Sequence, residues 1–257
     1  MTIPKQSTIL ITGASSGIGM SCANKFAEAG AKLILVARRK DRLKNLAEGL
    51  KKLFQTESLV IELDVRRREE VAKKLSTLPQ EWQAVDVLVN NAGLSRGLDK
   101  LQEGSVDDWE EMIDTNVKGL LYVSRTIIPG MIARGNGMII NIGSIAGQEV
   151  YPRGNVYCAS KFAVDALTRG LRMDLVDTPL RVCTVDPGLV ETEFSNVRFH
   201  GDAQRAKQTY QHLTPLTPDD VADAVLFCAT RPLHVQLAQI VMMPTSQAST
   251  TLVHRSQ

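Results

Sequence analysis

Short apolar runs alternate with longer stretches of helical periodicity along the chain, and this alternation predicts an α/β fold. The runs are almost continuously apolar, as expected for parallel strands that helices cover on both faces. Apolar residues recur at helical spacing over 18–30, and Gly30 provides a stop for that helix. We predict seven strands, at 8–12, 32–37, 58–63, 86–90, 138–142, 181–186 and 239–243.

Uninterrupted strand–helix alternation predicts a single Rossmann-type domain over 1–257, with a doubly wound parallel sheet and right-handed crossovers. No linker, repeat or low-complexity segment divides the chain. The irregular part is the polar segment 188–217, which follows a strand and contains one plausible helix at about 201–212. Ligands of open α/β sheets bind beyond the carboxyl ends of strands, so we expect 188–217 to form a substrate lid.

Composition and charge narrow the class of protein. The 257 residues are 44% hydrophobic and 23% charged, with a net charge of +2, which is typical of a soluble globular protein. The basic stretch 40–52 reads as a solvated helix face, and no basic stripe with interleaved aromatic residues predicts a nucleic-acid partner. The apolar runs are too short to span a membrane and the N-terminal residues lack a signal-peptide pattern, so we expect a cytoplasmic protein.

The cysteines do not indicate a disulfide framework or a metal site. They are scattered, at Cys22, Cys158, Cys183 and Cys228, and no two form a C-x-x-C pair. In a cytosolic chain we therefore expect reduced, mostly buried thiols and no bound metal.

The segment "TGASSGIG" (12–19) follows the first strand and opens the first helix. Gly13, Gly17 and Gly19 allow a sharp turn and a close approach of the backbone to a pyrophosphate. The helix N-terminus adds unpaired N–H groups and a partial positive charge. A tight turn without a ligand is the alternative, but the position between strand and helix favours a nucleotide site.

The end of the second strand indicates which nucleotide. An acidic residue about 20 positions after the glycines normally binds the ribose 2′-hydroxyl. Here Arg38 and Arg39 stand at that position, followed by Lys40. Arginine pairs bidentately with phosphate, whereas a carboxylate would repel it. The alternative is a helix start with solvated charges; we predict a 2′-phosphate site and hence NADP rather than NAD.

Two further strand ends carry candidate cofactor contacts. Asp64 and Val65 follow the third strand, where a side chain could reach the adenine, although Asp64 could equally cap the next helix. The segment "NNAG" (90–93) follows the fourth strand and offers either a small-residue passage past the cofactor or a polar turn.

Together these motifs resemble the short-chain dehydrogenase/reductase family over essentially the whole chain. The matching segments, in the family's order, are "TGASSGIG", "NNAG", "DTNVKG" with Asn116, "NIGSIAG" with Ser144, "YCASK" (157–161) and "DPGLVET" (186–192). The resemblance implies a sheet in the order 3-2-1-4-5-6-7, a nicotinamide cofactor and commonly a homotetramer. Segments such as "PGLVETEFSNVRFHGD" are similar to the NADP-dependent 3-hydroxy acid dehydrogenases, which act on serine, allo-threonine and 3-hydroxypropionate-type substrates.

The resemblance also implies a cofactor-binding set. Pro187 and Gly188 turn the chain after the sixth strand, and Val190 and Thr192 contact the carboxamide and pyrophosphate end of the cofactor. The full set is Gly13, Ser15, Ser16, Gly17, Ile18, Gly19, Arg38, Arg39, Asp64, Val65, Asn91, Ala92, Gly93, Tyr157, Lys161, Pro187, Gly188, Val190 and Thr192.

Tyr157 and Lys161 are four residues apart and therefore share one face of a predicted helix. A free tyrosine has a pKa of about 10 and is a poor base at neutral pH. A nearby lysine cation and the positive charge of an oxidised nicotinamide favour the phenolate. We predict that Tyr157 takes the hydroxyl proton of the substrate and returns it in the reducing direction.

The remaining catalytic roles come with the resemblance. Ser144 would hold the substrate oxygen beside Tyr157, in a polarising rather than nucleophilic role. Lys161 would bind the nicotinamide ribose. Asn116, at a local helix distortion, would hold a water that links Lys161 to solvent. Taken singly, Ser144 and Asn116 would read as structural residues.

A 3-hydroxy acid carries a carboxylate, so its pocket should offer a cation. The candidates are Arg153, Arg198 and Lys207, and Arg198 is favoured because it lies in the segment similar to the 3-hydroxy acid dehydrogenases. Each of them could instead be a solvated surface charge. Arg153, in "EVYPRG", stands where a small or neutral residue is expected.

Two other functions fit part of this pattern. A 3-ketoacyl-thioester or general carbonyl reductase would use the same fold and catalytic residues with a different lid. A non-catalytic NADPH-sensing protein would not need the complete set of Asn116, Ser144, Tyr157 and Lys161. The polar residues after the last strand are candidates for subunit contacts.

Overall fold

The computed structural model describes residues 6–256 and contains the predicted parallel sheet. The sheet has seven strands in the order β3-β2-β1-β4-β5-β6-β7, and every neighbouring pair is parallel. Each predicted strand is present, and no boundary moves by more than one residue. The strands are β1 (Thr8–Thr12), β2 (Lys32–Ala37), β3 (Ser58–Glu62), β4 (Val85–Asn90), β5 (Met138–Ile142), β6 (Arg181–Pro187) and β7 (Gln239–Met242).

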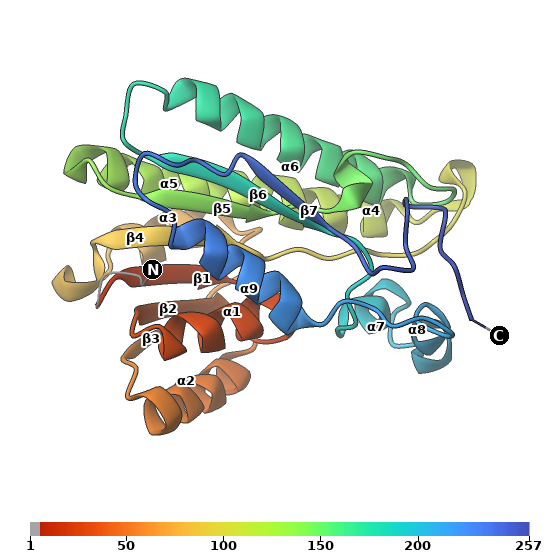
Figure 1. The fold of residues 1–257 in the computed structure, drawn as a ribbon, viewed down its shortest axis with the longest axis horizontal. Helices are drawn as coiled ribbons and strands as arrows, with labels where there is room; N and C mark the ends of the chain where they lie inside the picture. The colour runs from red at the N-terminus through yellow and green to blue at the C-terminus, as the bar shows by residue number, and fades with distance from the viewer. Residues whose placement is uncertain (1–5, 257) are drawn as a thin grey trace.

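Helices cover both faces of this sheet, which explains why its central strands are continuously apolar (Figure 1). One buried cluster lies under α1, α2 and α9, and a second lies under α3, α5 and α6. The α-helices are α1 (Gly17–Glu28), α2 (Lys40–Phe54), α3 (Arg68–Ser76), α4 (Val106–Ile113), α5 (Leu120–Arg134), α6 (Asn155–Asp174), α7 (Phe194–Arg198), α8 (Ala203–Gln208) and α9 (Pro218–Ala229). Short 3₁₀ turns span Gln80–Trp82, Leu101–Glu103 and Ile145–Gly147, and a π-helix spans Asp114–Gly119.

The strand order reverses between β1 and β4, because β2 and β3 lie to one side of β1 and the later strands to the other. The loops that leave the carboxyl ends of β1 and β4 separate at this point, which is where open α/β sheets bind their ligands. Helices α7 and α8 lie at this same end of the sheet, and the chain after β7 runs back toward them (Figure 1). The irregular segments of the fold therefore lie together at the carboxyl ends of the strands.

The segment 188–217 differs from the prediction of one helix at about 201–212. It contains two short helices, α7 and α8, because His200 and Gly201 adopt left-handed backbone angles with φ of 52° and 91°. Asp202 then starts α8 as its N-cap, accepting a hydrogen bond from the Arg205 amide at 3.0 Å. The short polar sequence gave too little helical periodicity to reveal this break.

All four cysteines are buried and no disulfide joins them, as predicted. Within residues 6–256, none of the helices combines the length and the apolar character that crossing a membrane requires.

Candidate functional site

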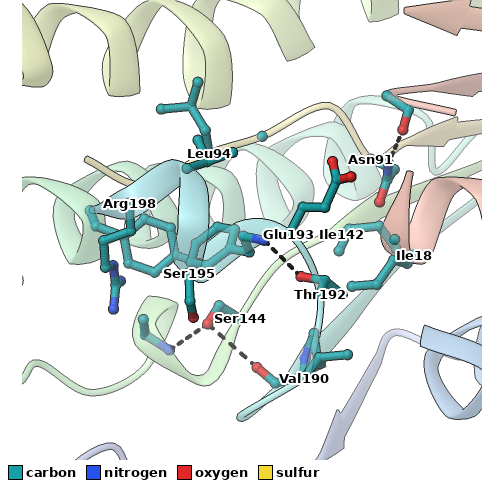
Figure 2. A pocket seen from close by; sticks show the side chains of 18 of the residues that line it. Ile18, Asn91, Leu94, Ile142, Ser144, Val190, Thr192, Glu193, Ser195 and Arg198 are labelled. Atoms are coloured by element: carbon teal, nitrogen blue, oxygen red, sulfur yellow. Dashed lines mark hydrogen bonds between the residues drawn. The ribbon is translucent and has the colours of Figure 1, made fainter. Parts of the chain in front are cut away.

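A cavity of about 770 Å³ opens at the carboxyl edge of the sheet, between the strand-end loops and α7. It brings together almost all the residues predicted from the sequence (Figure 2). The predicted residues that line it are Gly13, Ser15, Ser16, Gly17, Ile18, Arg38, Arg39, Asp64, Val65, Asn91, Ala92, Gly93, Ser144, Tyr157, Lys161, Pro187, Gly188, Val190, Thr192 and Arg198. Gly19, Asn116 and Arg153 are not among its lining residues.

The glycine loop is held against the loop after β4. A Cβ on Gly13 would come within 2.8 Å of Asn91 Nδ2, and Gly13 has a left-handed φ of 67°, so this position requires glycine. Asn91 fixes the contact by donating from Nδ2 to the Thr12 carbonyl at 2.9 Å (Figure 2). Ser16, the N-cap of α1, makes no side-chain capping bond, so the amides of the first turn face the cavity without that partner. This cradle fits a pyrophosphate.

The arginines after β2 line the cavity beside the glycine loop. Arg39 donates from Nε to Ser15 Oγ at 3.1 Å and from Nη2 to Ser16 Oγ at 2.6 Å, which ties it to the glycine loop. The Arg38 side chain is 53% exposed, and its nearest carboxylate, Glu111, is 3.7 Å away. Two cations beside a pyrophosphate cradle fit the 2′-phosphate of NADP.

Asp64 faces the cavity but does not cap the following helix. The N-cap of α3 is Arg67, and Asp64 is instead bound by Arg66, whose Nη2 lies 2.6 Å from Asp64 Oδ2. Burial raises the pKa of Asp64, but the hydrogen bonds from Arg66 outweigh burial and leave that pKa below its usual range. The carboxylate at this edge is therefore ionised and already paired.

Tyr157 and Lys161 lie in the first turns of α6, buried and lining the same cavity. Lys161 Nζ donates to the Ile142 carbonyl at 2.9 Å and lies 6.0 Å from the centre of the Tyr157 ring. Ser144 follows β5, and its hydroxyl accepts from the Ala146 amide at 3.1 Å and donates to the Pro187 carbonyl at 3.4 Å (Figure 2). The hydroxyl, phenol and ammonium thus converge on one part of the cavity.

Asn116 lies behind this group, in the π-helix, so the predicted helix distortion is present. Its side chain joins two segments: Oδ1 accepts from the Leu94 amide at 2.8 Å, while Nδ2 donates to the Leu94 carbonyl and to Ser160 Oγ. A Cβ on Gly93 would lie 3.3 Å from Asn116 Oδ1 and 3.7 Å from Lys161 Nζ. Asn116 therefore fixes the loop after β4 to α6, next to the lysine.

The groups of the chain itself favour a neutral phenol at Tyr157, whereas the predicted phenolate depends on Lys161 together with an oxidised nicotinamide. Burial raises the pKa of Tyr157, and the charge of Arg198 and a hydrogen bond with Ser144 only partly oppose this. Burial also lowers the pKa of Lys161 to about 8, with the Asp186 carboxylate acting in the opposite direction. Desolvation of the ring is thus the largest influence on the pKa of the phenol, and it favours the neutral form.

Arg198 reaches the cavity from the C-terminal end of α7. Its guanidinium carbon lies 5.3 Å from the Tyr157 ring centre and 5.4 Å from that of Phe194. It donates from Nε to Ser95 Oγ at 2.9 Å and from Nη2 to Tyr151 Oη at 2.6 Å. A partly buried cation next to the phenol can bind an anionic substrate group.

The other two predicted cations lie elsewhere. Arg153 has a left-handed φ of 67°, and the turn that this creates leaves its side chain exposed and outside the large cavity. Lys207 is exposed on α8 and is also absent from the cavity lining. The prediction that Arg153 contributes to the substrate pocket is therefore not supported by its position.

The polar residues after β7 make contacts within the chain that the sequence did not predict. Gln247 Oε1 accepts from the Leu189 amide at 2.8 Å, and Arg255 donates to the Thr209 carbonyl at 3.0 Å. Gln247, Thr250 and Thr251 also line the cavity. The sequence predicts only subunit contacts for these residues, because a polar tail carries no signal for the surface on which it folds.

Comparisons with known proteins agree with this geometry. The family described as short chain dehydrogenase matches residues 7–203. An NADP-dependent 3-hydroxy acid dehydrogenase from Salmonella typhi is 47% identical over 250 residues, covering 96% of this chain and 99% of the relative. An NADP-dependent 3-hydroxy acid dehydrogenase from Schizosaccharomyces pombe is 45% identical and covers 97% of each chain. The solved closed form of serine dehydrogenase complexed with NADP+ superimposes with a TM-score of 0.91 at 46% identity, covering 97% of this chain and 100% of that one.

Proposed function

Because the chain belongs to the short-chain dehydrogenase family, we propose that it is an NADP-dependent oxidoreductase acting on small 3-hydroxy acids. The reaction interconverts the 3-hydroxyl and 3-keto groups of substrates such as serine, allo-threonine and 3-hydroxypropionate. The observation that carries this proposal is the single cavity that joins the glycine cradle and Arg38 to Ser144, Tyr157, Lys161 and Arg198. Relatives covering almost the whole chain carry the same activity in their names.

In the proposed mechanism, NADP held by the glycine cradle and Arg38 would supply or accept the hydride, and the chain's own residues transfer the proton. Tyr157 donates its proton to the substrate oxygen during reduction and takes it back during oxidation. Ser144 holds that oxygen with a hydrogen bond, and the Lys161 ammonium stabilises the phenolate. Asn116 keeps the loop after β4 and α6 in place around them.

We assign the substrate carboxylate to Arg198. Among residues 6–256, Ser95 and Tyr151 hold two of its nitrogens, while Nη1 makes no hydrogen bond. Arg198 can therefore donate a hydrogen bond from Nη1 to a carboxylate without breaking its contacts with Ser95 and Tyr151. Because Arg198 belongs to α7, the segment 188–217 is proposed to act as the substrate lid of a single domain over 1–257.

The enzyme is further proposed to be a cytoplasmic homo-oligomer, a tetramer by family resemblance. Exposed apolar side chains on two neighbouring helices support an assembly: Leu121 on α5 is 40% exposed and Phe162 on α6 is 41% exposed. Light scattering of the purified protein measures the state directly.

One assay tests the proposed function. NADP+ reduction is measured with serine, allo-threonine, 3-hydroxypropionate and 3-hydroxyisobutyrate, and NADPH oxidation with 3-ketoacyl thioesters and neutral carbonyls. Turnover of the acids at much higher kcat/KM than the thioesters is the expected result. A preference for thioesters would favour the carbonyl-reductase alternative, and tight NADPH binding without any turnover would favour a sensor.

Replacing Arg38 by aspartate is expected to raise the KM for NADPH by about tenfold or more, because a carboxylate there repels the 2′-phosphate. The KM for NADH, which lacks that phosphate, should not rise. Arg67→Asp is a matched control, since Arg67 is an exposed arginine outside the cavity. An unchanged KM for NADPH in Arg38→Asp would remove Arg38 from the cofactor site.

The kcat for carbonyl reduction is expected to fall as the pH rises through the pKa of Lys161, about 8. Lys161 is charged below this pKa and neutral above it, and only the charged form stabilises the phenolate left after Tyr157 has donated its proton. A pH profile at saturating NADPH and substrate measures this, with return to pH 7 as a check on irreversible loss. A constant rate up to pH 10 would contradict the role of the ammonium.

A further inference from the structure

Glu193 lines the cavity between Arg198 on one side and Ile18 and Asn91 on the other (Figure 2). No motif in the sequence predicts this position. One carboxylate oxygen is 2.8 Å from Arg39 Nη1 and the other is 2.6 Å from Arg42 Nη1. These hydrogen bonds lower the pKa of Glu193, so the side chain is anionic. An anion thus binds two guanidinium groups beside the glycine loop.

The pair with Arg39 conflicts with a phosphate at that arginine, which lines the cavity. All three nitrogens of the Arg39 guanidinium are engaged, by Ser15, Ser16 and Glu193. A 2′-phosphate can replace the serine hydroxyls as partners, because hydroxyls can turn and donate to the phosphate themselves. The Glu193 carboxylate has no proton to donate and repels a second anion at short range.

Glu193 is also the N-cap residue of α7, so it links the arginines to the lid helix. The next residue, Phe194, packs edge-on against the Tyr157 ring with centroids 5.6 Å apart. The other end of α7 is held by the loop after β4, where Arg96 donates to the Val197 carbonyl at 2.6 Å and the Gly97 amide donates to the Arg198 carbonyl at 2.9 Å. The pair with Arg39 and Arg42 therefore anchors the end of α7 nearest the cofactor.

We infer that Glu193 is a specificity-determining and positioning residue that competes with the cofactor 2′-phosphate for Arg39, while its pairs with Arg39 and Arg42 anchor the lid helix α7. The inference rests on the proposed NADP function. The inference has one consequence: the contact that holds α7 over the substrate also weakens the binding of the 2′-phosphate. Removing the carboxylate should tighten the binding of the 2′-phosphate and loosen the binding of the hydroxy acid.

The test compares Glu193→Gln with Glu191→Gln. Glu191 is a matched control, since it is exposed, two residues away, and its carboxylate makes no hydrogen bond or ion pair within residues 6–256. Calorimetry with adenosine 2′,5′-bisphosphate should show about threefold to tenfold tighter binding to Glu193→Gln than to wild type. Adenosine 5′-monophosphate, which lacks the 2′-phosphate, should bind both proteins equally, and Glu191→Gln should match wild type.

Steady-state kinetics provide the second readout. Glu193→Gln should show a KM for the hydroxy acid about threefold or more above wild type, because α7 has lost its anchor, while Glu191→Gln should not. Equal or weaker binding of the bisphosphate by Glu193→Gln would overturn the inference, since the carboxylate would then be neutral or helpful to the phosphate. A wild-type protein that does not distinguish the bisphosphate from the monophosphate would instead overturn the NADP assignment, and the inference with it.

Discussion

Replacing Tyr157 by phenylalanine is expected to reduce kcat by about 10²-fold or more while leaving NADPH binding intact. The substitution removes one oxygen and keeps the ring that packs against Phe194, so α7 retains its contact. Phenylalanine cannot donate a proton to the substrate oxygen during reduction or accept one during oxidation. The loss should appear in both directions, because the same group serves as acid and as base.

Single-turnover rates and fluorescence titration with NADPH measure the two quantities separately. Tyr122→Phe is a suitable control, since Tyr122 is partly buried on α5 and does not line the cavity. Turnover close to wild type in Tyr157→Phe would end the assignment of Tyr157 as the proton carrier. A large loss of NADPH affinity would show that the phenol acts mainly in cofactor binding.

Replacing Arg198 by alanine is expected to raise the KM for carboxylate substrates by about 10- to 100-fold without changing the KM for NADPH. A charge-assisted hydrogen bond from a partly buried guanidinium has an effect of this order. The same variant tested on a neutral carbonyl compound should lose much less, because that substrate has no anion to pair. This difference separates recognition of the carboxylate from general damage to α7.

Arg205→Ala provides the matched control. Arg205 lies on α8, stacks over the Phe199 ring at 4.5 Å and does not line the cavity. Its removal should leave both KM values close to wild type. If Arg198→Ala raised the KM for acids and for neutral carbonyls equally, Arg198 would shape the pocket rather than bind the carboxylate.

The fold could be predicted from the sequence because its signals are local. Each strand is a short apolar run next to a helical pattern, and a parallel sheet covered on both faces requires little else. The catalytic candidates are equally local: Tyr157 and Lys161 share a helix, and Ser144 lies two residues after a strand. The family resemblance then supplied the strand order, which the sheet confirms.

The remainder depended on contacts between distant residues and on burial. Arg39 and Glu193 are 154 positions apart, so no spacing rule connects them. The sequence alone does not indicate that the guanidinium of Arg66 binds both carboxylate oxygens of Asp64. The direction of the Tyr157 pKa shift depended on how completely the fold encloses the ring, which a four-residue spacing cannot indicate.

Because all four thiols are buried, the native protein should react only slowly with alkylating reagents. Cys22 is enclosed in the core, and burial raises its pKa to about 12, so almost none of the reactive thiolate forms at neutral pH. Maleimide uptake by the native chain would therefore mark unfolding rather than surface chemistry. A cysteine introduced at exposed Lys207 would be the preferred attachment point for a fluorophore that reports on α8.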